Sequence, residues 1–297
     1  MALRTTKNTS PGEDQIYYTH LKNLPISALD YLAKIYETTL KICYFPDEWK
    51  LGITILIPKP GKDLSDPKSY RPITLLSALG KTLERIINVR LKHHLENNEL
   101  IPESQAGFRK NRSTQDQLFR ITQDITVAFQ RDQRVLATFF DIEKAFDKLW
   151  IEGLILKLKD ALGLKSGTIA IILSFLTDRF VKFRVGKTLS TPLNLKAGTP
   201  QGSILSPTLF NIGVSDIPQS LNERVKLSQY ADDIGTWAIG KDQFTTIPLL
   251  QKYNDRITEW CKEWKIKMAP SKTQLIEFKR LYPHKYSSPE MKINDTI

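Results

Sequence analysis

The sequence predicts an α+β fold that contains an antiparallel sheet with helices on one face. A buried strand pattern over 135–141 supports this fold, as do two short strands over 225–230 and 234–239 that flank an acidic turn. A long helical pattern over 246–264 and a last strand over 273–278 follow. This order of strand, helices, strand, strand, helix and strand is the ferredoxin-like, split βαβ arrangement. In it, the end of the first strand lies beside the hairpin of the middle two.

The part of the chain before this sheet is expected to hold two helices and a strand-loop-strand unit. Apolar residues at helical spacing predict helices over 27–43 and 79–95. Between them, a β-branched run over 53–57 is followed by a basic loop and a second extended segment. Two shorter helices are expected over about 152–162 and 168–178, by the same helical spacing of apolar residues.

Composition and charge restrict the class of protein. With 297 residues, of which 41% are apolar and 25% charged, the chain is typical of soluble globular proteins and not of disordered or membrane-embedded ones. Lys and Arg outnumber Asp and Glu by 43 to 32, and the formal charge of +11 favours a polyanionic partner over a merely basic surface. Neither a secretory signal nor a membrane-spanning run is recognisable. We therefore expect an intracellular protein of the cytoplasm or nucleus, with no membrane partner.

Three acidic residues occupy the predicted strand ends. Asp141 follows the first strand, and Asp232 and Asp233 lie in the turn between the middle two. Carboxylates that converge at one sheet edge repel one another, and bound cations commonly offset this repulsion. Oxygen ligands without a nearby His or Cys cluster favour Mg²⁺ or Mn²⁺ over zinc, and two such ions can catalyse an in-line phosphoryl displacement. The alternative is that the Asp-Asp pair only occupies a turn or a helix cap.

The acids belong to a series of motifs that resembles the reverse transcriptases, most closely the polymerase domain of jockey-like, LINE-type non-LTR retrotransposons. The resemblance extends over nearly the whole chain, and the order and spacing of the motifs also match. The segments are Ile57–Lys62, Ser69–Ile73, Gln105–Arg109, Phe139–Asp147, Gly198–Ser203 and Tyr230–Asp233. Together, in the correct order, they argue against coincidence. The resemblance implies a right-hand polymerase fold with fingers and a palm, in which the ferredoxin-like βαββαβ sheet forms the palm.

The resemblance also implies a catalytic site. Asp141, Asp232 and Asp233 would hold two Mg²⁺ ions, for which Mn²⁺ can substitute, and Asp232 would be the direct ligand of the pair. The backbone carbonyl of Ile142 would complete one coordination shell. Lys272 matches the lysine that protonates the departing pyrophosphate, which is a general-acid role. Family members usually carry Asn near position 269, where this chain has Ala.

Four residues match nucleotide-binding positions of the family. Lys59 and Arg71 would grip the triphosphate, although contact with template phosphates or plain solvation are alternatives and Lys62 is an equally charged neighbour. Phe146 would exclude a 2′-hydroxyl by bulk and so select deoxynucleotides, or else it is an ordinary core aromatic. Gln201 would contact the nucleotide and template from a glycine-containing loop, or else the loop is a plain turn before a helix.

The resemblance divides the chain into four parts. We expect an N-terminal extension over 1–26, fingers over 27–134, and a palm over 135–280 that an insertion of the fingers can interrupt. The start of a primer-grip or thumb region is expected over 281–297. The thumb would therefore be largely absent from this chain. A full-length parent would add a thumb after this chain and an endonuclease domain before it.

Two functions remain in competition at the level of sequence. The first is an RNA-directed DNA polymerase that extends a DNA primer on an RNA template, using deoxynucleoside triphosphates and Mg²⁺. The second is a catalytically weak or inactive truncated copy that keeps only nucleic-acid binding, which the missing flanking domains and the charge of +11 favour. The intact set of acids favours the first.

Overall fold

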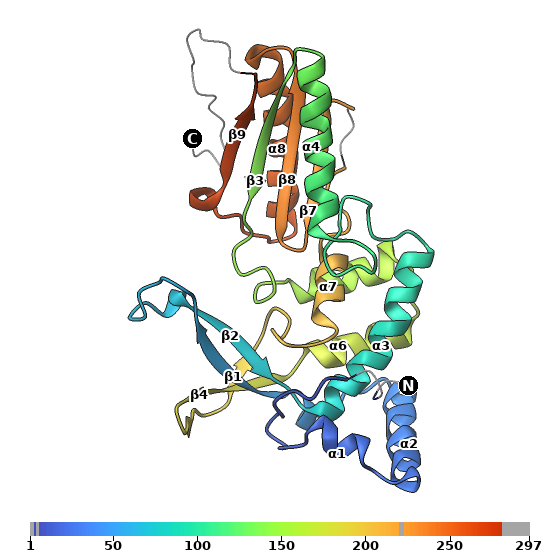
Figure 1. Ribbon diagram of the computed structural model, residues 1–297. Helices are drawn as coiled ribbons and strands as arrows, with labels where there is room; N and C mark the ends of the chain where they lie inside the picture. Colours follow the sequence, from blue (N-terminus) through green and yellow to red (C-terminus); the bar gives the residue numbers. More distant parts are fainter. Residues whose placement is uncertain (1–2, 4–5, 220–222, 281–297) are drawn as a thin grey trace. The chain divides into compact units, whose positions relative to one another are not determined.

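The computed structural model describes residue 3, residues 6–219 and residues 223–280 (Figure 1). The chain forms two compact units, each made from two stretches of sequence. The first unit contains residues 1–100 and 146–209, and the second contains residues 101–145 and 210–297. Each unit combines helices with a sheet, so the predicted α+β class is confirmed. The thumb or primer-grip region expected over 281–297 lies outside the described residues.

The sheet of the first unit has the strand order β2-β1-β4-β5, and β6 also pairs with β4. β1 (Leu51–Pro58) runs antiparallel to β2 (Tyr70–Leu75), which confirms the predicted strand-loop-strand unit. β1 also runs parallel to β4 (Arg179–Val185), from a part of the chain that is distant in sequence and for which no strand is predicted. The remaining strands are β5 (Thr188–Leu189) and β6 (Leu193–Leu195).

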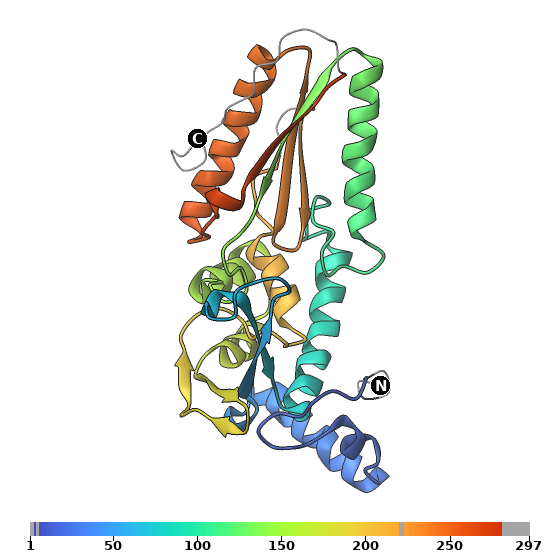
Figure 2. The same ribbon diagram turned by 60° about the vertical axis from the view of Figure 1, so that its left-hand side comes forward.

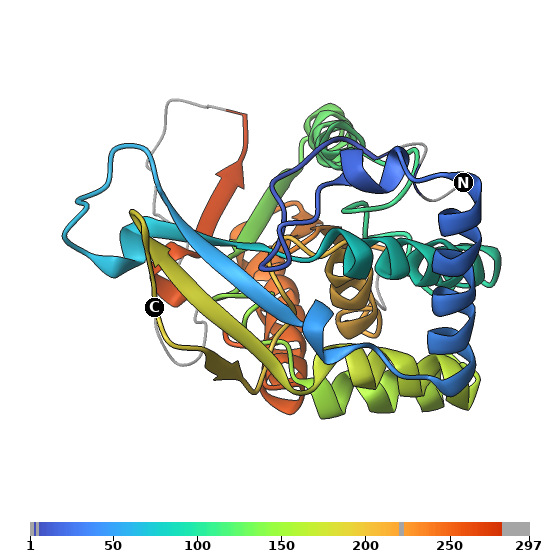
Figure 3. The ribbon, with the colours of Figure 1, turned by 90° about the horizontal axis from the view of Figure 1, so that it is seen from below.

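The helices of the first unit lie to one side of its strands, as Figure 3 shows. They are α1 (Tyr18–Lys22), α2 (Ile26–Ile42), α3 (Ala78–Asn97), α5 (Ile151–Leu156) and α6 (Ser166–Leu176). α2 and α3 confirm the predicted helices over 27–43 and 79–95, and α6 confirms one of the two shorter ones. The other shorter helix is interrupted, because α5 gives way to a π-helical turn over Lys157–Ala161. The residues of α7 (Ser206–Gly213) are divided between the two units.

The sheet of the second unit has the order β7-β8-β3-β9, and each neighbouring pair is antiparallel. Its strands are β3 (Arg134–Phe140), β7 (Val225–Tyr230), β8 (Asp233–Gly240) and β9 (Gln274–Phe278). The first strand of this sheet therefore lies beside β8 of the β7–β8 hairpin. This strand order confirms the ferredoxin-like arrangement predicted from the sequence.

The prediction that helices cover one face of this sheet is wrong, because α4 (Thr114–Gln130) and α8 (Gln243–Glu263) lie on opposite faces (Figure 2). The Thr236 hydroxyl donates to Asn254 of α8 at 2.8 Å, whereas the Trp237 indole donates to Asp124 of α4 at 2.8 Å. Neighbouring residues of a strand point to opposite faces, so these two bonds assign the two helices to different sides.

A hydrophobic cluster attaches α4 to its face of the sheet. Trp237 is 1% exposed, and it packs in one cluster with residues of α4 and β3, with Phe278 of β9 at its margin. The buried members are Ile121, Ala128, Val135, Ala137 and Trp237. Full burial of a larger apolar side chain, such as that of Ile121 or Val135, contributes about 1.5–3 kcal/mol relative to exposure. The cluster explains why α4 forms part of the second unit although no helix is predicted there from the sequence.

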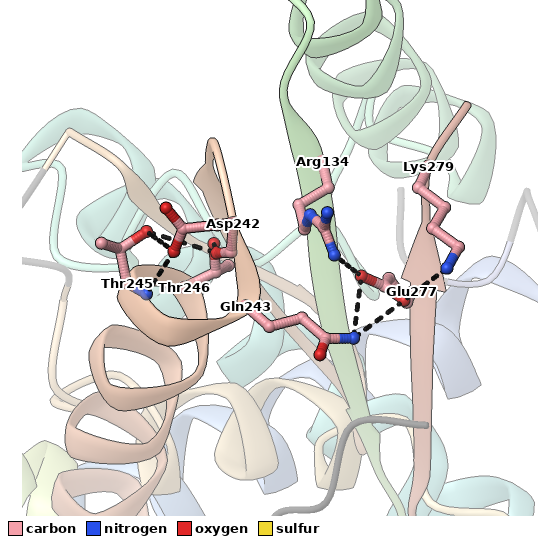
Figure 4. Close-up of polar contacts among 7 residues, drawn as sticks. All are labelled: Arg134, Asp242, Gln243, Thr245, Thr246, Glu277 and Lys279. Atoms are coloured by element: carbon pink, nitrogen blue, oxygen red, sulfur yellow. Dashed lines mark hydrogen bonds and ion pairs between the residues drawn. The ribbon is translucent and has the colours of Figure 1, made fainter. Parts of the chain in front are cut away.

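Charged groups hold the end of the sheet at which β3 begins (Figure 4). The buried Glu277 carboxylate accepts a hydrogen bond from Arg134 at 2.7 Å and from Gln243 at 3.4 Å, and the Lys279 ammonium lies 3.8 Å from its other oxygen. Nearby, the Asp242 side chain caps α8 by accepting from the Thr245 amide at 2.8 Å. Because Arg134 is the first residue of β3, these contacts anchor the end of the strand opposite to Asp141.

Further features concern the cysteines and the helices. Cys43 and Cys261 are both free thiols, and burial raises the pKa of Cys261 to about 12. Within the described part of the chain, we find no helix with the length and apolar character needed to cross a membrane.

Candidate active site

The three predicted acids lie at one edge of the sheet in the second unit. Phe140, the last residue of β3, stands opposite Ile234 of β8. The next residues at this edge are Asp141 and Asp233, and Asp232 precedes Asp233 in the loop of the β7–β8 hairpin. The local sequence explains this placement, because apolar strand residues end at polar ones and the strands therefore end there. The expected proximity of the first strand's end to the acidic hairpin is confirmed.

The charges of these acids influence one another. Partial desolvation raises the pKa of Asp233 above its ordinary value, and the negative charges of Asp232 and Asp141 raise it further. Neighbouring carboxylates disfavour each other's ionised form, and this repulsion is relieved when a cation binds among them. The edge of the sheet is therefore an electrostatically favourable place for a cation.

Lys272 supplies a positive charge at this edge. Its ammonium nitrogen lies 2.7 Å from Oδ2 of Asp141, and this contact raises the pKa of Lys272, with a further contribution from the charge of Glu143. The backbone amide of Ala269 donates to the carbonyl of Asp141 at 2.8 Å. The short turn Pro270–Lys272 is thus attached to Asp141 by a backbone bond and by a side chain, with alanine at position 269.

The backbone around Ile142 follows an antiparallel bridge to Met268. Its two hydrogen bonds use the carbonyl of Asp141 and the amide of Glu143, which donates to Lys267 at 2.8 Å. In this pattern the residue between the two bonded positions directs its own carbonyl away from the partner strand. The bridge therefore does not use the carbonyl of Ile142, the group predicted to complete a metal shell.

The donor set suits a hard divalent cation, but the side chains do not form a closed cage. Among the described residues, no group of three or more His, Cys, Asp or Glu side chains is gathered closely enough to hold a metal ion. The oxygens of Asp141, Asp232 and Asp233 are the ligand type that Mg²⁺ prefers, and their mutual repulsion favours such an ion. The Asp141 carboxylate, however, is engaged with Lys272. A cation that binds through Oδ2 of Asp141 would therefore compete with Lys272 for this oxygen.

The predicted nucleotide-binding residues belong to the first unit. Arg71 stands opposite Ile57 in the β1–β2 pair, and its side chain is exposed. The Lys59 ammonium donates to the carbonyl of Lys68 at 2.8 Å, and the Lys59 amide donates to Ser69 at 2.8 Å. The loop between the two strands is therefore closed by bonds at its base, and Arg71 lies on the strand that leaves it.

The loop that carries Gln201 is tied to two other predicted positions of the first unit. The Gln201 amide nitrogen donates to Asp147 at 2.9 Å, one residue after Phe146. The backbone carbonyl of Gln201 accepts a hydrogen bond from the backbone amide of Thr74 at 2.8 Å, and Thr74 lies on the same strand as Arg71. In the same loop, the amide of Thr199 donates to the Phe146 carbonyl at 2.7 Å. The structure thus joins the segments of Arg71, Phe146 and Gln201 within one unit.

Two glycines of this loop are required by close backbone contacts. Gly198 has φ +73°, and a Cβ atom there would lie 2.3 Å from the carbonyl oxygen of Asp147. Gly202 has φ +114°, and a Cβ atom would lie 2.5 Å from the carbonyl oxygen of Thr74. Both distances are shorter than any real contact, so the loop can adopt this path only with glycine at these positions.

Arg179 binds the backbone of the same loop, and no signal in the sequence predicts this role. It is 2% exposed, and its Nη2 atom donates to the carbonyls of Ala197 and Gly198 at 2.8 and 2.7 Å. Burial lowers the pKa of Arg179 to about 10, while the charge of Asp147 opposes this shift. The partners are backbone atoms, which no sequence motif identifies.

Glu84 of α3 is a second missed residue, and it anchors the segment after the loop. Its Oε2 atom accepts from the Ser203 hydroxyl and from the amides of Ile204 and Leu205, the latter at 2.7 and 3.1 Å. The side chain is buried, and burial raises the pKa of Glu84 against the opposing effect of these donors and of Lys81. A charged residue inside the predicted apolar pattern of this helix was the available signal.

Comparison with known proteins identifies the relatives of this chain. A family model described as "Reverse transcriptase (RNA-dependent DNA polymerase)" matches residues 57–290. Three proteins of Drosophila melanogaster are similar over most of the chain. The "Probable RNA-directed DNA polymerase from transposon BS" is 37% identical over 89% of this chain. The "Probable RNA-directed DNA polymerase from transposon X-element" is 36% identical over 93% of this chain. The "RNA-directed DNA polymerase from mobile element jockey" is 34% identical over 91% of this chain.

This chain spans about 30% of the length of these relatives. Among solved structures, a telomerase from Candida tropicalis in complex with a fragment of telomeric RNA matches 91% of this chain and 47% of its own length, with a TM-score of 0.56 and 16% identity. A telomerase from Candida albicans matches 84% of this chain and 46% of its own length, with a TM-score of 0.57 and 14% identity. These likenesses show a shared fold.

Proposed function

Because the chain belongs to the reverse transcriptase family, we propose that it forms the fingers and palm of an RNA-directed DNA polymerase. Its substrates would be an RNA template, a DNA primer and deoxynucleoside triphosphates. The observation that carries the proposal is the position of Asp141 beside the Asp232–Asp233 hairpin at one edge of the sheet, where the carboxylates raise the pKa of Asp233. A full-length parent would add an endonuclease and a thumb to this catalytic core.

In this proposal, Asp141, Asp232 and Asp233 bind two Mg²⁺ ions, or Mn²⁺, together with the carbonyl of Ile142. When bound, the ions activate the primer 3′-hydroxyl and stabilise the leaving oxygen of the pyrophosphate. Lys272 is proposed to act on the departing pyrophosphate from the sheet edge at which it lies beside Asp141. A lysine ammonium is protonated at neutral pH, so it can give a proton to the pyrophosphate.

The first unit would bind the incoming nucleotide. Arg71 and Lys59 are proposed to contact the triphosphate, for which Arg offers a bidentate fork and Lys a point charge. Gln201 donates to Asp147 through its amide nitrogen, so its amide oxygen can accept a hydrogen bond from the substrate. Phe146 is proposed to lie under the sugar and to exclude a 2′-hydroxyl.

Nucleic-acid binding without catalysis is a second candidate function. It is favoured by the formal charge of +11 and by the lack, among the described residues, of a ready-formed group of three metal-binding side chains. A basic protein binds phosphates by releasing their counterions, and this needs no catalytic site. The two candidates differ in whether Mg²⁺ converts binding into synthesis.

Primer extension separates these two functions. The wild-type chain is expected to extend oligo(dT) on poly(rA) with dTTP and Mg²⁺, and chelation by EDTA should stop the reaction. Binding of the same labelled template-primer is measured in parallel without dTTP. If the chain binds the template-primer but extends it with neither Mg²⁺ nor Mn²⁺, the polymerase proposal is wrong for this chain and nucleic-acid binding alone is supported.

The substitution Phe146→Ala tests the proposed sugar discrimination. Removal of the ring should admit a 2′-hydroxyl, so incorporation of UTP relative to dTTP is expected to rise by about tenfold or more. The ratio of kcat/KM for the two nucleotides gives the measurement. Phe180→Ala is a matched control, because Phe180 is a partly exposed aromatic on β4 of the same unit. Equal sugar discrimination in the two variants would contradict the role of Phe146.

A further inference from the structure

The catalytic hairpin has an unusual loop residue. Tyr230 pairs with Asp233, so Ala231 and Asp232 form a two-residue loop. Ala231 has φ +57°, a conformation that hairpin loops normally assign to glycine and that costs a residue with a side chain about 1–2 kcal/mol. Ala231 is also only 6% exposed, so its backbone amide and carbonyl need hydrogen-bond partners within the protein in place of water. Something within the protein must hold this conformation.

A single side chain binds both backbone groups of Ala231. The Oε1 atom of Gln105 accepts from the Ala231 amide at 2.9 Å, and its Nε2 atom donates to the Ala231 carbonyl at 3.2 Å. Oε1 also accepts from the Gly107 amide at 2.8 Å, which fixes the side chain to its own loop. Gln105 is 0% exposed. Its amide therefore acts as a buried clamp on the residue that immediately precedes Asp232.

The segment around Gln105 is itself held in place. The amide of Ala106 donates to the carbonyl of Gln229 at 2.9 Å, and the Gln229 amide donates to Ser104 at 2.7 Å. A Cβ atom on Gly107 would lie 2.2 Å from the Ala231 nitrogen, so this segment touches the hairpin loop directly. The clamp is thus attached both to the strand that enters the hairpin and to the loop itself.

We propose that Gln105 is a positioning residue of the active site, which holds Ala231 in its strained conformation and thereby sets the direction of the Asp232 carboxylate. This inference rests on the proposed polymerase function for its effect on metal binding. Gln105 reaches no substrate in this role and acts only through the backbone of Ala231. Without the clamp the loop can relax to a less strained conformation, and the carboxylate of Asp232 moves with it.

The role requires an amide of this length. Gln105→Met keeps the length and the apolar part of the side chain but removes both hydrogen-bonding atoms. Gln105→Glu keeps the acceptor, but when ionised it has no donor and places a negative oxygen against the carbonyl of Ala231. Both variants are therefore expected to release the loop, although the second retains a polar side chain.

Gln117→Met is the matched control. Gln117 is 8% exposed and belongs to the same unit, where it donates to the Ser104 carbonyl at 3.3 Å and accepts from the Ser228 hydroxyl at 2.7 Å. It is thus a buried glutamine with two side-chain hydrogen bonds, neither of which reaches Ala231. The loss of stability should be similar in Gln105→Met and Gln117→Met, as judged by thermal denaturation.

Two measurements then isolate the positioning role. Hydrogen exchange of the Ala231 amide, followed by NMR, should accelerate at least about tenfold in Gln105→Met and Gln105→Glu, because the amide loses its acceptor or the loop opens. Mn²⁺ binding, followed by the EPR signal of the free ion, should weaken by about tenfold or more, as is usual when support for a metal ligand is removed. Gln117→Met should change neither quantity.

The outcomes are distinguishable. If the Ala231 amide exchanges as slowly in Gln105→Met as in Gln117→Met, or if the two variants bind Mn²⁺ equally well, Gln105 does not position the site. A wild type that neither binds Mn²⁺ nor extends a primer contradicts the proposed function instead. Even then, the exchange of the Ala231 amide decides whether Gln105 holds the loop.

Discussion

Replacement of Asp232 by asparagine is expected to abolish primer extension without a loss of stability. Asparagine keeps the size of the side chain but removes the negative charge that is proposed to bind the metal ions. The expected decrease in kcat/KM is at least about a thousandfold, which corresponds to about 4 kcal/mol. Single-nucleotide extension under steady-state conditions provides the measurement.

The free energy of unfolding of Asp232→Asn should equal that of the wild type or exceed it slightly. The charge of Asp232 contributes to the raised pKa of Asp233, so its removal relieves a repulsion in the folded state. The gain is expected to be no more than about 1 kcal/mol, because these groups are accessible to water. Asp255→Asn is the control, since Asp255 is an exposed residue of α8 that accepts a hydrogen bond from Gln251. Activity of Asp232→Asn at the level of this control would refute the catalytic assignment.

Removal of the Glu84 carboxylate is expected to cause the largest loss of stability. Glu84→Ala would leave the Ser203 hydroxyl and the amides of Ile204 and Leu205 without their acceptor in a buried place. A buried donor that loses its partner costs about 1–3 kcal/mol, so the free energy of unfolding should fall by about 3 kcal/mol or more. Urea denaturation measures this change. Glu37→Ala, at an exposed position of α2, should stay within about 0.5 kcal/mol of the wild type.

Glu84→Gln separates the charge of Glu84 from its hydrogen bonds. The amide oxygen can still accept, so this variant should be much more stable than Glu84→Ala. Burial raises the pKa of Glu84, so between the unfolded and folded pKa values the folded protein holds a proton that the unfolded chain has lost. The contribution of Glu84 to the free energy of unfolding is therefore fully present below the pKa that Glu84 has in the unfolded chain. It is lost as the pH rises through the higher pKa that Glu84 has in the folded protein. Glu84→Gln should remove this decline, and parallel pH profiles of the two proteins would contradict the shifted pKa.

The sheet of the second unit was predictable because its signals are local. β3, β7, β8 and β9 each consist of a short apolar or alternating run that ends at polar residues, and α8 has a clear helical period. The order of these elements suffices to predict their neighbours in a split βαβ arrangement. The cover of the second face was missed although the signals of α4 are also local, with a capping box at Ser113 and Asp116 and with Ile121, Ile125 and Ala128 at helical spacing. The nearly continuous apolar run of β8 was a signal that both faces are buried.

The support of the candidate site was not predictable in the same way. The side chains that support the site bind backbone groups that are distant in the sequence. Glu84 binds the amide of Leu205, 121 residues away, Arg179 the carbonyl of Gly198, 19 residues away, and Gln105 the carbonyl of Ala231, 126 residues away. Backbone amides and carbonyls are the same in every residue, so no residue type marks them as partners. A buried polar residue in a helix or loop shows only that some partner exists.

The sequence by itself determined the chemical character of the candidate site. Asp141 and Asp233 stand at strand ends and Asp232 in the loop before β8, and both their carboxylate groups and these positions follow from short stretches of chain. Tertiary structure alone decided how these acids are held. It places Lys272 against Asp141 and the amide of Gln105 against Ala231, because such contacts depend on the path of the backbone between residues more than a hundred positions apart.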